Sequence, residues 1–470
     1  MGIGDIADGI ARSIENAQAS VNEALFEPVI RLGVTGLARA GKTVFITSLV
    51  ANLLERNRMG HVAAIREGRL QAAFLRPQPD DTVPRFDFEG HMASLSAAQP
   101  EWPESTRAIS ELRLSLRLQP SGLLAGLSGP RIVHVDIVDY PGEWLLDLGL
   151  LDLSYEGWSE GVLKRVNSRE WGTELSSIAR TIDPAGTFEE SAARDLAARF
   201  TEYLQATRDK GLSDCTPGRF LLPGEMAGSP ALTFGPLPMA DRAGRGSMYR
   251  EMERRFEAYK SQIVKPFFRD HFAKIDRQIV LVDLLGAVHS GPEAVEDLRR
   301  AMAATLSAFR PGQNAFLSKL FLGRRVEKIL FAATKADHLH HKQHGQLTEL
   351  AEALLSDAKT RAEFAGAQTG AMSVAALRAS IEETRRHEGK NLDLVKGRLM
   401  DGRTAALYAG RLPDDPAEIL HPARDGASKW LNTDFDIMTF APPKLSAKPG
   451  EGPPHIRLDR AVEFLIGDRL

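Results

Sequence analysis

The segment from Arg31 to Val50 constrains the fold of this chain more than any other, because it predicts a strand, a glycine-containing loop and a helix in direct succession. Residues 31–35 carry apolar side chains at alternate positions, and the apolar residues from Phe45 onward recur at helical spacing. The sequence between them, GLARAGKT at positions 36–43, fits the pattern G-x-x-x-x-G-K-[ST]. In the order strand, loop and helix, this pattern predicts a loop that binds the phosphates of a nucleotide.

The residue types in this loop suit phosphate binding. Gly36 and Gly41 permit backbone conformations in which successive N–H groups converge on an anion, and the following helix directs its positive end toward the same point. Lys42 supplies a positive charge for the β- and γ-phosphates, and the Thr43 hydroxyl is one ligand for an octahedral magnesium ion. The other residues expected around the phosphates are Ala38, Arg39, Ala40 and Val44.

Length and composition limit what the remainder of the chain can be. Its 470 residues are enough for roughly three domains, and 43% hydrophobic with 26% charged residues is typical of a globular protein with a sizeable core. A net charge of −3 gives no indication of nucleic-acid binding. The single cysteine, Cys215, excludes an internal disulfide. No apolar run approaches the roughly 18–20 residues that cross a bilayer and no secretion signal is evident, so we expect a cytoplasmic protein.

Residues 1–30 predict an amphipathic helix ahead of the first strand. Apolar residues recur in it four and three positions apart, at Ile3, Ala7, Ile10, Ile14, Ala17, Val21 and Ala24. Such a seam packs on its own domain, binds a partner helix, or makes peripheral contact with a membrane through residues 3–25. The low density of Lys and Arg argues against strong attraction to anionic lipid.

A second motif follows a predicted hairpin. Residues 56–106 show no sustained periodicity, and we expect a long loop there. Residues 108–118 then alternate as a strand, and residues 131–144 begin as a buried strand that ends in DYPGE. An acid at the end of such a strand, facing a phosphate loop, can hold magnesium through a water molecule, which makes Asp139 the predicted metal-binding carboxylate. Gly142 lets the backbone donate an N–H group close to the γ-phosphate.

Asp283 competes with Asp139 for the metal role, because DLLG at positions 283–286 repeats the D-x-x-G pattern at the end of RQIVLVDLLG. We favour Asp139, since its strand follows a hairpin partner and its glycine is directly followed by Glu143. Asp283 is then expected to form a turn or to cap a helix.

The third motif, TKAD at positions 334–337, follows the apolar strand within VEKILFAATKADHL. The Asp337 carboxylate can accept two hydrogen bonds from the ring N–H and the exocyclic amine of guanine. Adenine offers no such donor pair and would leave the carboxylate unpaired. By analogy with bidentate contacts to bases, this difference is worth roughly 1–3 kcal/mol. The stem of Lys335 can lie along the base and the phosphate loop.

A last strand is predicted within residues 370–380, GAMSVAALRAS. A backbone N–H group near Ala376 or Leu377 can reach the guanine carbonyl, and Ser373 is an alternative placement for that contact. The sequence does not decide between them.

The order of the motifs GLARAGKT, DYPGE and TKAD resembles the translation-factor and Ras-like branch of the P-loop GTPases. Over nearly its whole length, including WPEST and VDLLGAVHSG, the chain is more closely similar to the YcjX-like bacterial stress proteins, long catalogued as predicted ATPases. The resemblance implies a Ras-like α/β fold with a mostly parallel central sheet, GTP or GDP and Mg²⁺ as ligands, and a stress-related process. It also implies a switch threonine that binds magnesium in the triphosphate state; Thr106 is favoured, with Ser105 as the alternative.

The chain departs from the Ras-like pattern after Gly142, where Glu143 stands in place of the glutamine that usually orients the attacking water. A carboxylate there repels the γ-phosphate, so we expect slow intrinsic hydrolysis or assistance from another group. Arg39 can assist by supplying positive charge in cis, as an arginine finger does. The alternative is that Arg39 faces the solvent and only lies over the nucleotide.

The chain is longer than a minimal GTPase, and the additional material is expected to be partly regulatory. A helical insertion follows the second switch and is predicted to report nucleotide state to an unidentified protein partner. A small β-rich extension follows the GTPase domain, with a hairpin turn at Asp401–Gly402. The expected segments are an N-terminal helix (1–30), the GTPase domain (31–144 and 277–385), the helical insertion (145–276), the hairpin extension with a linker (386–456) and a C-terminal helix (457–470).

The histidine-rich sequence DHLHHKQH, residues 337–344, raises the question of a metal site, because His340 and His344 are four residues apart. No acidic or cysteine partner has convincing spacing, so we expect a solvated helix face instead.

The leading hypothesis is a magnesium-dependent switch that hydrolyses GTP slowly to GDP. One alternative is an ATPase of the same fold in which TKAD is accidental. Another is a nucleotide-binding scaffold without significant hydrolysis.

Overall fold

The computed structural model describes residues 27–37, 39–104, 106, 108–120, 129–240, 243–307, 326–364, 366–387, 389–427, 435–445 and 448–470. The apolar seam predicted at residues 3–25 lies outside them, as do Ala38 and Ser105. Within the described part of the chain, no helix combines the length and the apolarity that crossing a membrane requires.

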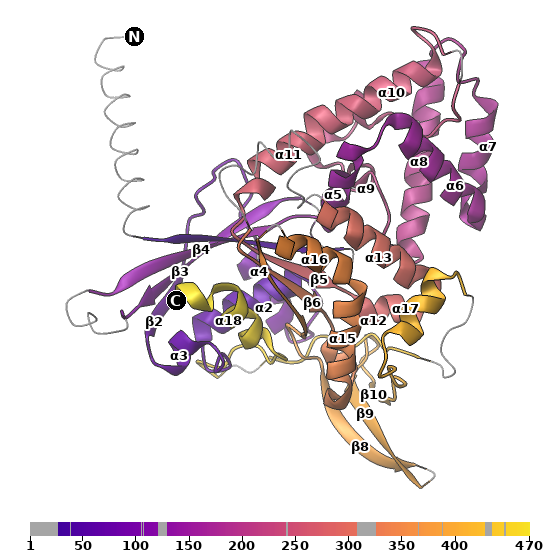
Figure 1. Cartoon of the computed structure of the whole chain (residues 1–470). Coiled ribbons are helices and arrows are strands. Elements are labelled where there is room, and N and C mark those ends of the chain that lie inside the picture. Colours follow the sequence, from indigo (N-terminus) through magenta and orange to yellow (C-terminus); the bar gives the residue numbers. More distant parts are fainter. Residues whose placement is uncertain are drawn as a thin grey trace, which may run out of the picture.

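Seven strands form the central sheet, in the spatial order β2-β3-β4-β1-β5-β6-β7 (Figure 1). They are β1 (Val29–Gly36), β2 (Leu70–Arg76), β3 (Ser110–Leu118), β4 (Arg131–Asp139), β5 (Arg277–Val282), β6 (Lys328–Ala333) and β7 (Gln368–Ser373). Strands β4, β1, β5, β6 and β7 pair in parallel, and β3 and β2 add antiparallel pairs at one edge. The predicted α/β fold with a mostly parallel sheet is confirmed, and so is the hairpin, as β3 and β4.

Both faces of this sheet are covered by helices, which explains why its central strands are continuously apolar. Successive residues of a strand point to opposite faces. In β5, Ile279 and Leu281 belong to one hydrophobic cluster, whereas Val280 and Val282 belong to the other. The helices of the first cluster include α2 (Lys42–Glu55) and α18 (Leu458–Ile466), and those of the second include α12 (Leu284–Ser290), α13 (Pro292–Ser307), α15 (His344–Leu354) and α16 (Ser356–Phe364).

The prediction of a long loop at residues 56–106 is wrong. That segment contains the short helix α3 (Ala63–Arg66), the strand β2 and the helix α4 (Phe88–Ser96). The sequence of β2, LQAAFLR, has no strand alternation. It becomes an edge strand through antiparallel pairing with β3, a tertiary contact that no local pattern reveals.

The last predicted strand, residues 370–380, is divided in the structure. β7 ends at Ser373, and β8 (Ser380–His387) belongs to a separate sheet. Between them the chain turns toward its C-terminal segment. The Ala375 N–H donates to the carbonyl of Ile456 over 3.1 Å. This hydrogen bond to a residue far along the chain takes the place of the strand pairing that would have continued β7.

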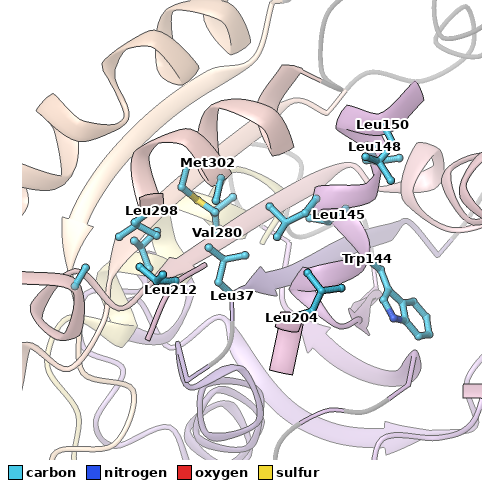
Figure 2. Packing of buried hydrophobic residues seen from close by; sticks show 14 of the residues in the cluster. Leu37, Trp144, Leu145, Leu148, Leu150, Leu204, Leu212, Val280, Leu298 and Met302 are labelled. Carbon is cyan, nitrogen blue, oxygen red and sulfur yellow. The ribbon is translucent and has the colours of Figure 1, made fainter. Parts of the chain in front are cut away.

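The predicted amphipathic helices between β4 and β5 are present. This insertion consists of α5 (Gly142–Leu146), α6 (Tyr155–Ser168), α7 (Thr173–Thr181), α8 (Glu190–Asp209), α9 (Gly218–Leu221), α10 (Met248–Tyr259) and α11 (Lys265–Asp270). Its interior is aromatic, and the rings of Trp158 and Phe256 stack with their centroids 5.0 Å apart. Figure 2 shows how this core reaches the sheet, because Leu204 of α8, Trp144 of α5 and Val280 of β5 belong to one cluster. The insertion therefore shares a hydrophobic core with the sheet.

A smaller antiparallel sheet has the order β10-β9-β8 and contains β9 (Lys390–Arg398) and β10 (Thr404–Leu407). The hairpin turn predicted at Asp401–Gly402 is confirmed between β9 and β10, with Gly402 at a φ of 86°. The β8–β9 hairpin extends away from the central sheet (Figure 1). The chain continues to α17 (Ala417–Arg424) and ends after α18, which confirms the predicted C-terminal helix.

Candidate nucleotide-binding site

The glycine-containing loop connects the end of β1 to the start of α2. Gly41 and Arg39 both have positive φ values, 81° and 65°, so the loop makes the left-handed bends that a phosphate-binding nest requires. The Lys42 ammonium donates to the carbonyl of Gly36 over 2.8 Å and is only 8% exposed. The loop thus surrounds the ammonium group of Lys42, which is predicted to bind the phosphates.

The end of β4 lies directly against this loop. A Cβ atom added at Gly142 would stand 2.1 Å from the Gly36 carbonyl oxygen, so only glycine fits there. Because β4 pairs in parallel with β1, the DYPGE segment leaves the sheet beside the loop. The backbone of Gly142 is therefore placed where the sequence expects it to meet the γ-phosphate.

The three predicted magnesium-binding residues are connected by hydrogen bonds. The hydroxyl oxygens of Thr43 and Thr106 are 3.3 Å apart, and the Thr106 hydroxyl donates to Asp139 Oδ2 over 2.6 Å. The other carboxylate oxygen, Asp139 Oδ1, is buried and has no hydrogen-bond partner among the residues that the structure describes. Three hard oxygen groups, one of them with a buried unpaired atom, fit a magnesium ion.

Burial also affects the charge of Asp139. It raises the pKa of this carboxyl to about 6, although the nearby ammonium of Lys42 and the hydroxyl of Thr106 favour the ionised form. A cation bound at Asp139 would compensate the buried negative charge and so offset the free-energy cost of ionising this carboxyl.

A single cavity of about 1140 Å³ joins the phosphate loop to the TKAD segment. The predicted residues that line it are Arg39, Ala40, Gly41, Lys42, Thr43, Val44, Thr106, Glu143, Lys335, Asp337, Ala376 and Leu377. Gly36 accepts a hydrogen bond from Lys42 and Asp139 one from Thr106, so both stand directly behind this lining. Gly142 packs on Gly36 and is followed in the chain by Glu143. The structure therefore brings the predicted site residues to one place, except Ala38, which lies outside the described residues.

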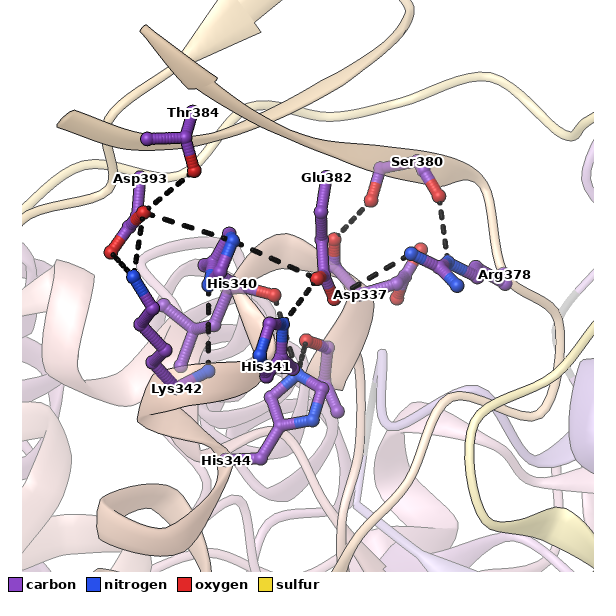
Figure 3. Close-up of polar contacts among 12 residues, drawn as sticks. Asp337, His340, His341, Lys342, His344, Arg378, Ser380, Glu382, Thr384 and Asp393 are labelled. Carbon is purple, nitrogen blue, oxygen red and sulfur yellow. Dashed lines mark hydrogen bonds and ion pairs between the residues drawn. The ribbon is translucent and has the colours of Figure 1, made fainter. Parts of the chain in front are cut away.

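The TKAD segment holds Asp337 in a fixed orientation. Its Oδ2 atom accepts a hydrogen bond from the Ala379 N–H over 2.8 Å, and its backbone carbonyl accepts one from the Ser380 hydroxyl (Figure 3). Asp337 is 4% exposed and lines the cavity. A carboxylate held in this way is suited to recognise the edge of a base.

Asp283, the competing acid, has the structural role that the sequence suggested. It is the N-cap residue of α12, where its side chain accepts from the Gly286 N–H over 3.0 Å. It also accepts from the Lys335 ammonium over 2.5 Å. The expectation of a helix-capping acid is confirmed, and Asp283 in addition anchors Lys335 beside Asp337.

The loop after β7 distinguishes the two placements of the last base contact. The Ser373 N–H is already donated to the Thr348 hydroxyl over 3.0 Å. Ala376 and Leu377 instead line the cavity. This geometry favours a backbone contact from Ala376 or Leu377.

Several cavity residues were not anticipated from the sequence. They are Trp102, Arg208, the segment Leu221–Gly224 from the insertion and the segment Ile437–Phe440 near the C-terminus. The Trp102 indole donates to the Phe440 carbonyl over 2.8 Å, which fixes the C-terminal segment over the cavity. No local motif marks these residues, because they reach the cavity only through tertiary packing.

The interpretation of residues 337–344 as a solvated helix face is wrong for two of the histidines. His340 and His344 are both buried. His344 Nε2 lies 2.8 Å from the carbonyl of Ala336 and so supports the TKAD turn. The four-residue spacing of the histidines is accidental, since His340 precedes the helix α15 that His344 begins.

A mostly parallel sheet with a glycine-containing loop between β1 and α2, and further site segments after β4 and β6, defines the P-loop class of α/β proteins. Residues 30–470 match the family model of the YcjX-like family, DUF463, and the chain belongs to this family. A protein of Escherichia coli (strain K12) named Ras-like GTPase YcjX is 38% identical over 458 residues, 94% of this chain and 96% of the relative. A protein of Shewanella oneidensis with the same name is 34% identical over 467 residues, 94% of each chain.

Proposed function

We propose that this protein is a magnesium-dependent GTPase that acts as a nucleotide-controlled switch. The observation that carries the proposal is the position of Asp337. Its carboxylate is held by the Ala379 N–H in the same cavity that Lys42 and Thr43 line. Relatives that match nearly the whole chain are named Ras-like GTPases, which supports guanine rather than adenine as the base.

Different residues bind the phosphates, the magnesium ion and the base. Lys42 and the N–H groups of the loop bind the phosphates, and Thr43, Thr106 and Asp139 hold the magnesium ion. When bound, the ion neutralises negative charge on the phosphate oxygens. Because Thr106 joins this set from a loop, its position is expected to depend on whether the γ-phosphate is present.

Glu143 accounts for the proposed slow hydrolysis. It is 6% exposed and lines the cavity where a Ras-like glutamine would orient water. A buried carboxylate beside the γ-phosphate raises the cost of the negative charge that develops during phosphoryl transfer. Arg39 and Arg208 also line a small pocket together with Glu143, and their positive charges oppose that of the carboxylate. Arg39 is the residue that we propose to assist hydrolysis in cis.

The helical insertion is proposed to report nucleotide state, because it rests directly on the second switch. A Cβ atom at Gly218 would stand 2.3 Å from the Glu143 carbonyl oxygen, so the two backbones are in contact. The Arg219 guanidinium lies 3.2 Å from the centre of the Trp144 ring. The Trp144 indole in turn donates to the Leu222 carbonyl over 3.2 Å.

A buried carboxylate completes this connection. Asp147 follows α5 and accepts hydrogen bonds from the Gly218 N–H over 2.7 Å and from the Tyr259 hydroxyl over 2.5 Å. A displacement of the switch segment must therefore move the α9 region and the end of α10. We propose that a protein effector recognises this change on the surface of the insertion.

Two measurements on the full chain test the proposal. Calorimetric titration should show tighter binding of GDP than of ADP by about 5- to 150-fold, since an unpaired Asp337 costs roughly 1–3 kcal/mol. Equal affinities would favour the ATPase alternative. Phosphate release in saturating GTP and Mg²⁺ should be slow but above background, and release at background together with tight GDP binding would favour the scaffold.

Hydrogen exchange tests the switch itself. Residues 140–147 and 216–224 should be better protected with a non-hydrolysable GTP analogue than with GDP, because the γ-phosphate orders the switch that the insertion contacts. The exposed β8–β9 hairpin provides an internal control, since it lies away from these contacts. Identical protection in both nucleotide states would contradict a switch.

A further inference from the structure

The histidines after the TKAD segment face two acidic residues of the small sheet. His341 Nδ1 is 2.5 Å from Glu382 Oε2, and His340 Nε2 is 3.7 Å from the same oxygen (Figure 3). The ligand atoms of His340, His341 and Glu382 all lie within 4.8 Å of one another. Asp393 Oδ1 is the next nearest carboxylate oxygen, 3.9 Å from His340 Nε2.

The backbone explains why these side chains converge. His340 is extended, with φ −66° and ψ 145°, and it begins the short turn that leads into α15, so adjacent histidines can face the same carboxylate. Their rings lie 4.3 Å apart at an angle of 34°. On the other side, Thr384 pairs with Asp393 across β8 and β9, which places Glu382 and Asp393 on one face as diagonal neighbours.

We propose that His340, His341 and Glu382 bind a divalent transition-metal ion of the zinc type. Two imidazoles with one carboxylate are the donor set that Zn²⁺ takes at three-ligand sites, where water occupies the fourth position. Mg²⁺ and Ca²⁺ prefer oxygen ligands alone and are disfavoured here. Asp393 lies close enough to hydrogen-bond that water.

The surroundings allow an ion to enter. The side chain of His341 is 62% exposed, so the site opens to solvent. His340 Nδ1 accepts a long hydrogen bond from the Lys342 N–H over 3.5 Å. Nε2, the ring nitrogen that faces Glu382, is therefore the one open to the ion, and it releases its proton on binding. Two cations neutralise the carboxylates at present: Lys342 contacts Asp393 over 2.8 Å, and Arg378 lies 3.5 Å from Glu382. Both are long side chains that can turn away without moving the backbone.

The site would connect the base-recognition turn to the small sheet. His340 follows Asp337 by three residues, and Ser380, which hydrogen-bonds the Asp337 carbonyl, precedes Glu382 by two. A bound ion would therefore cross-link the two segments that orient Asp337. Binding of the ion does not depend on the proposed GTPase function. An effect of the ion on nucleotide affinity would rest on that function.

The test uses the full chain after treatment with a chelator, in buffer with excess Mg²⁺ to occupy sites that take hard ions. Titration with Zn²⁺ should show one equivalent bound, and Co²⁺ in its place should give the visible absorption of a four-coordinate site. Glu382→Gln and His341→Ala should each weaken Zn²⁺ binding by at least about tenfold.

Glu383→Gln is the matched control, because Glu383 is the neighbouring acid on the opposite face of β8 and pairs with Arg385. It should bind Zn²⁺ as the unmodified chain does. Thermal unfolding with and without Zn²⁺ gives a second readout, in which the ion should raise the melting temperature of the unmodified chain and of Glu383→Gln only. The absence of stoichiometric Zn²⁺ binding, or an equal loss in Glu383→Gln, would overturn the proposal.

Discussion

Asp147 connects the switch segment to the insertion and should give the stability of the protein a measurable dependence on pH. Burial raises the pKa of this carboxyl from 3.8 to about 7, against the opposing effect of its hydrogen bonds from Tyr259 and Gly218. Between about pH 4 and pH 7 the folded protein therefore holds a proton that the unfolded chain has released. The free energy of unfolding falls as the pH rises through this window and levels off above it.

The size of the effect follows from the same values. A rise in pKa from 3.8 to about 7 corresponds to about 4 kcal/mol. About 3 kcal/mol of this is lost between pH 5 and pH 8. In Asp147→Asn the side chain still accepts from the Gly218 N–H but cannot ionise, so this loss is absent. Relative to the unmodified chain, the variant should gain about 3 kcal/mol between these two pH values.

Urea unfolding followed by tryptophan fluorescence at pH 5 and pH 8 measures this difference. Other carboxyls with raised pKa values, such as Glu111 and Asp139, titrate in both proteins and cancel in the comparison. Asp195→Asn, on the exposed side of α8, is the control and should leave the difference near zero. If the stability of Asp147→Asn relative to the unmodified chain is the same at pH 5 and at pH 8, Asp147 is not buried in the contact between switch and insertion.

Three further substitutions test individual contacts. Gly218→Ala places a methyl group 2.3 Å from the Glu143 carbonyl oxygen. It should lower the free energy of unfolding by about 1–3 kcal/mol and abolish the nucleotide-dependent protection of the α9 region. Gly244→Ala, with open space around it, should change neither the stability nor the protection. Thr106→Ala removes the hydrogen bond to Asp139 and should weaken binding of a GTP analogue with Mg²⁺ by about tenfold while GDP affinity stays within about twofold, as measured by fluorescence titration. Arg39→Ala should slow phosphate release at least about tenfold with little change in GDP affinity, and an unchanged rate would assign Arg39 to the solvent.

Local patterns predicted the parts of the site that local sequence determines. The loop at residues 36–43, the D-x-x-G turn and TKAD each depend on glycine conformation, helix polarity or the end of a strand, and those requirements are visible in a few consecutive residues. The capping role of Asp283 was predictable for the same reason. The hairpin at Asp401–Gly402 follows from turn chemistry alone.

Features that depend on pairing between distant segments could not be predicted. β2 becomes a strand only because β3 lies beside it. Strand β7 ends because the backbone that follows it hydrogen-bonds Ile456 instead of a neighbouring strand. The sequence around DHLHHKQH offers the histidines no acidic partner with convincing spacing, because Glu382 approaches them from β8. The C-terminal wall of the cavity, near Phe440, likewise arises from the contact with Trp102.

The central claim is that Asp337 recognises guanine on a nucleotide whose phosphates lie on residues 36–43. The most direct measurement is the affinity of Asp337→Asn for GDP and for xanthosine diphosphate, because xanthine replaces the exocyclic amine of guanine with a carbonyl that the asparagine amide can donate to. The unmodified chain and the exposed control Asp414→Asn should prefer GDP, and Asp337→Asn should prefer the xanthine nucleotide. A variant that keeps the preference for GDP would contradict the assignment of Asp337.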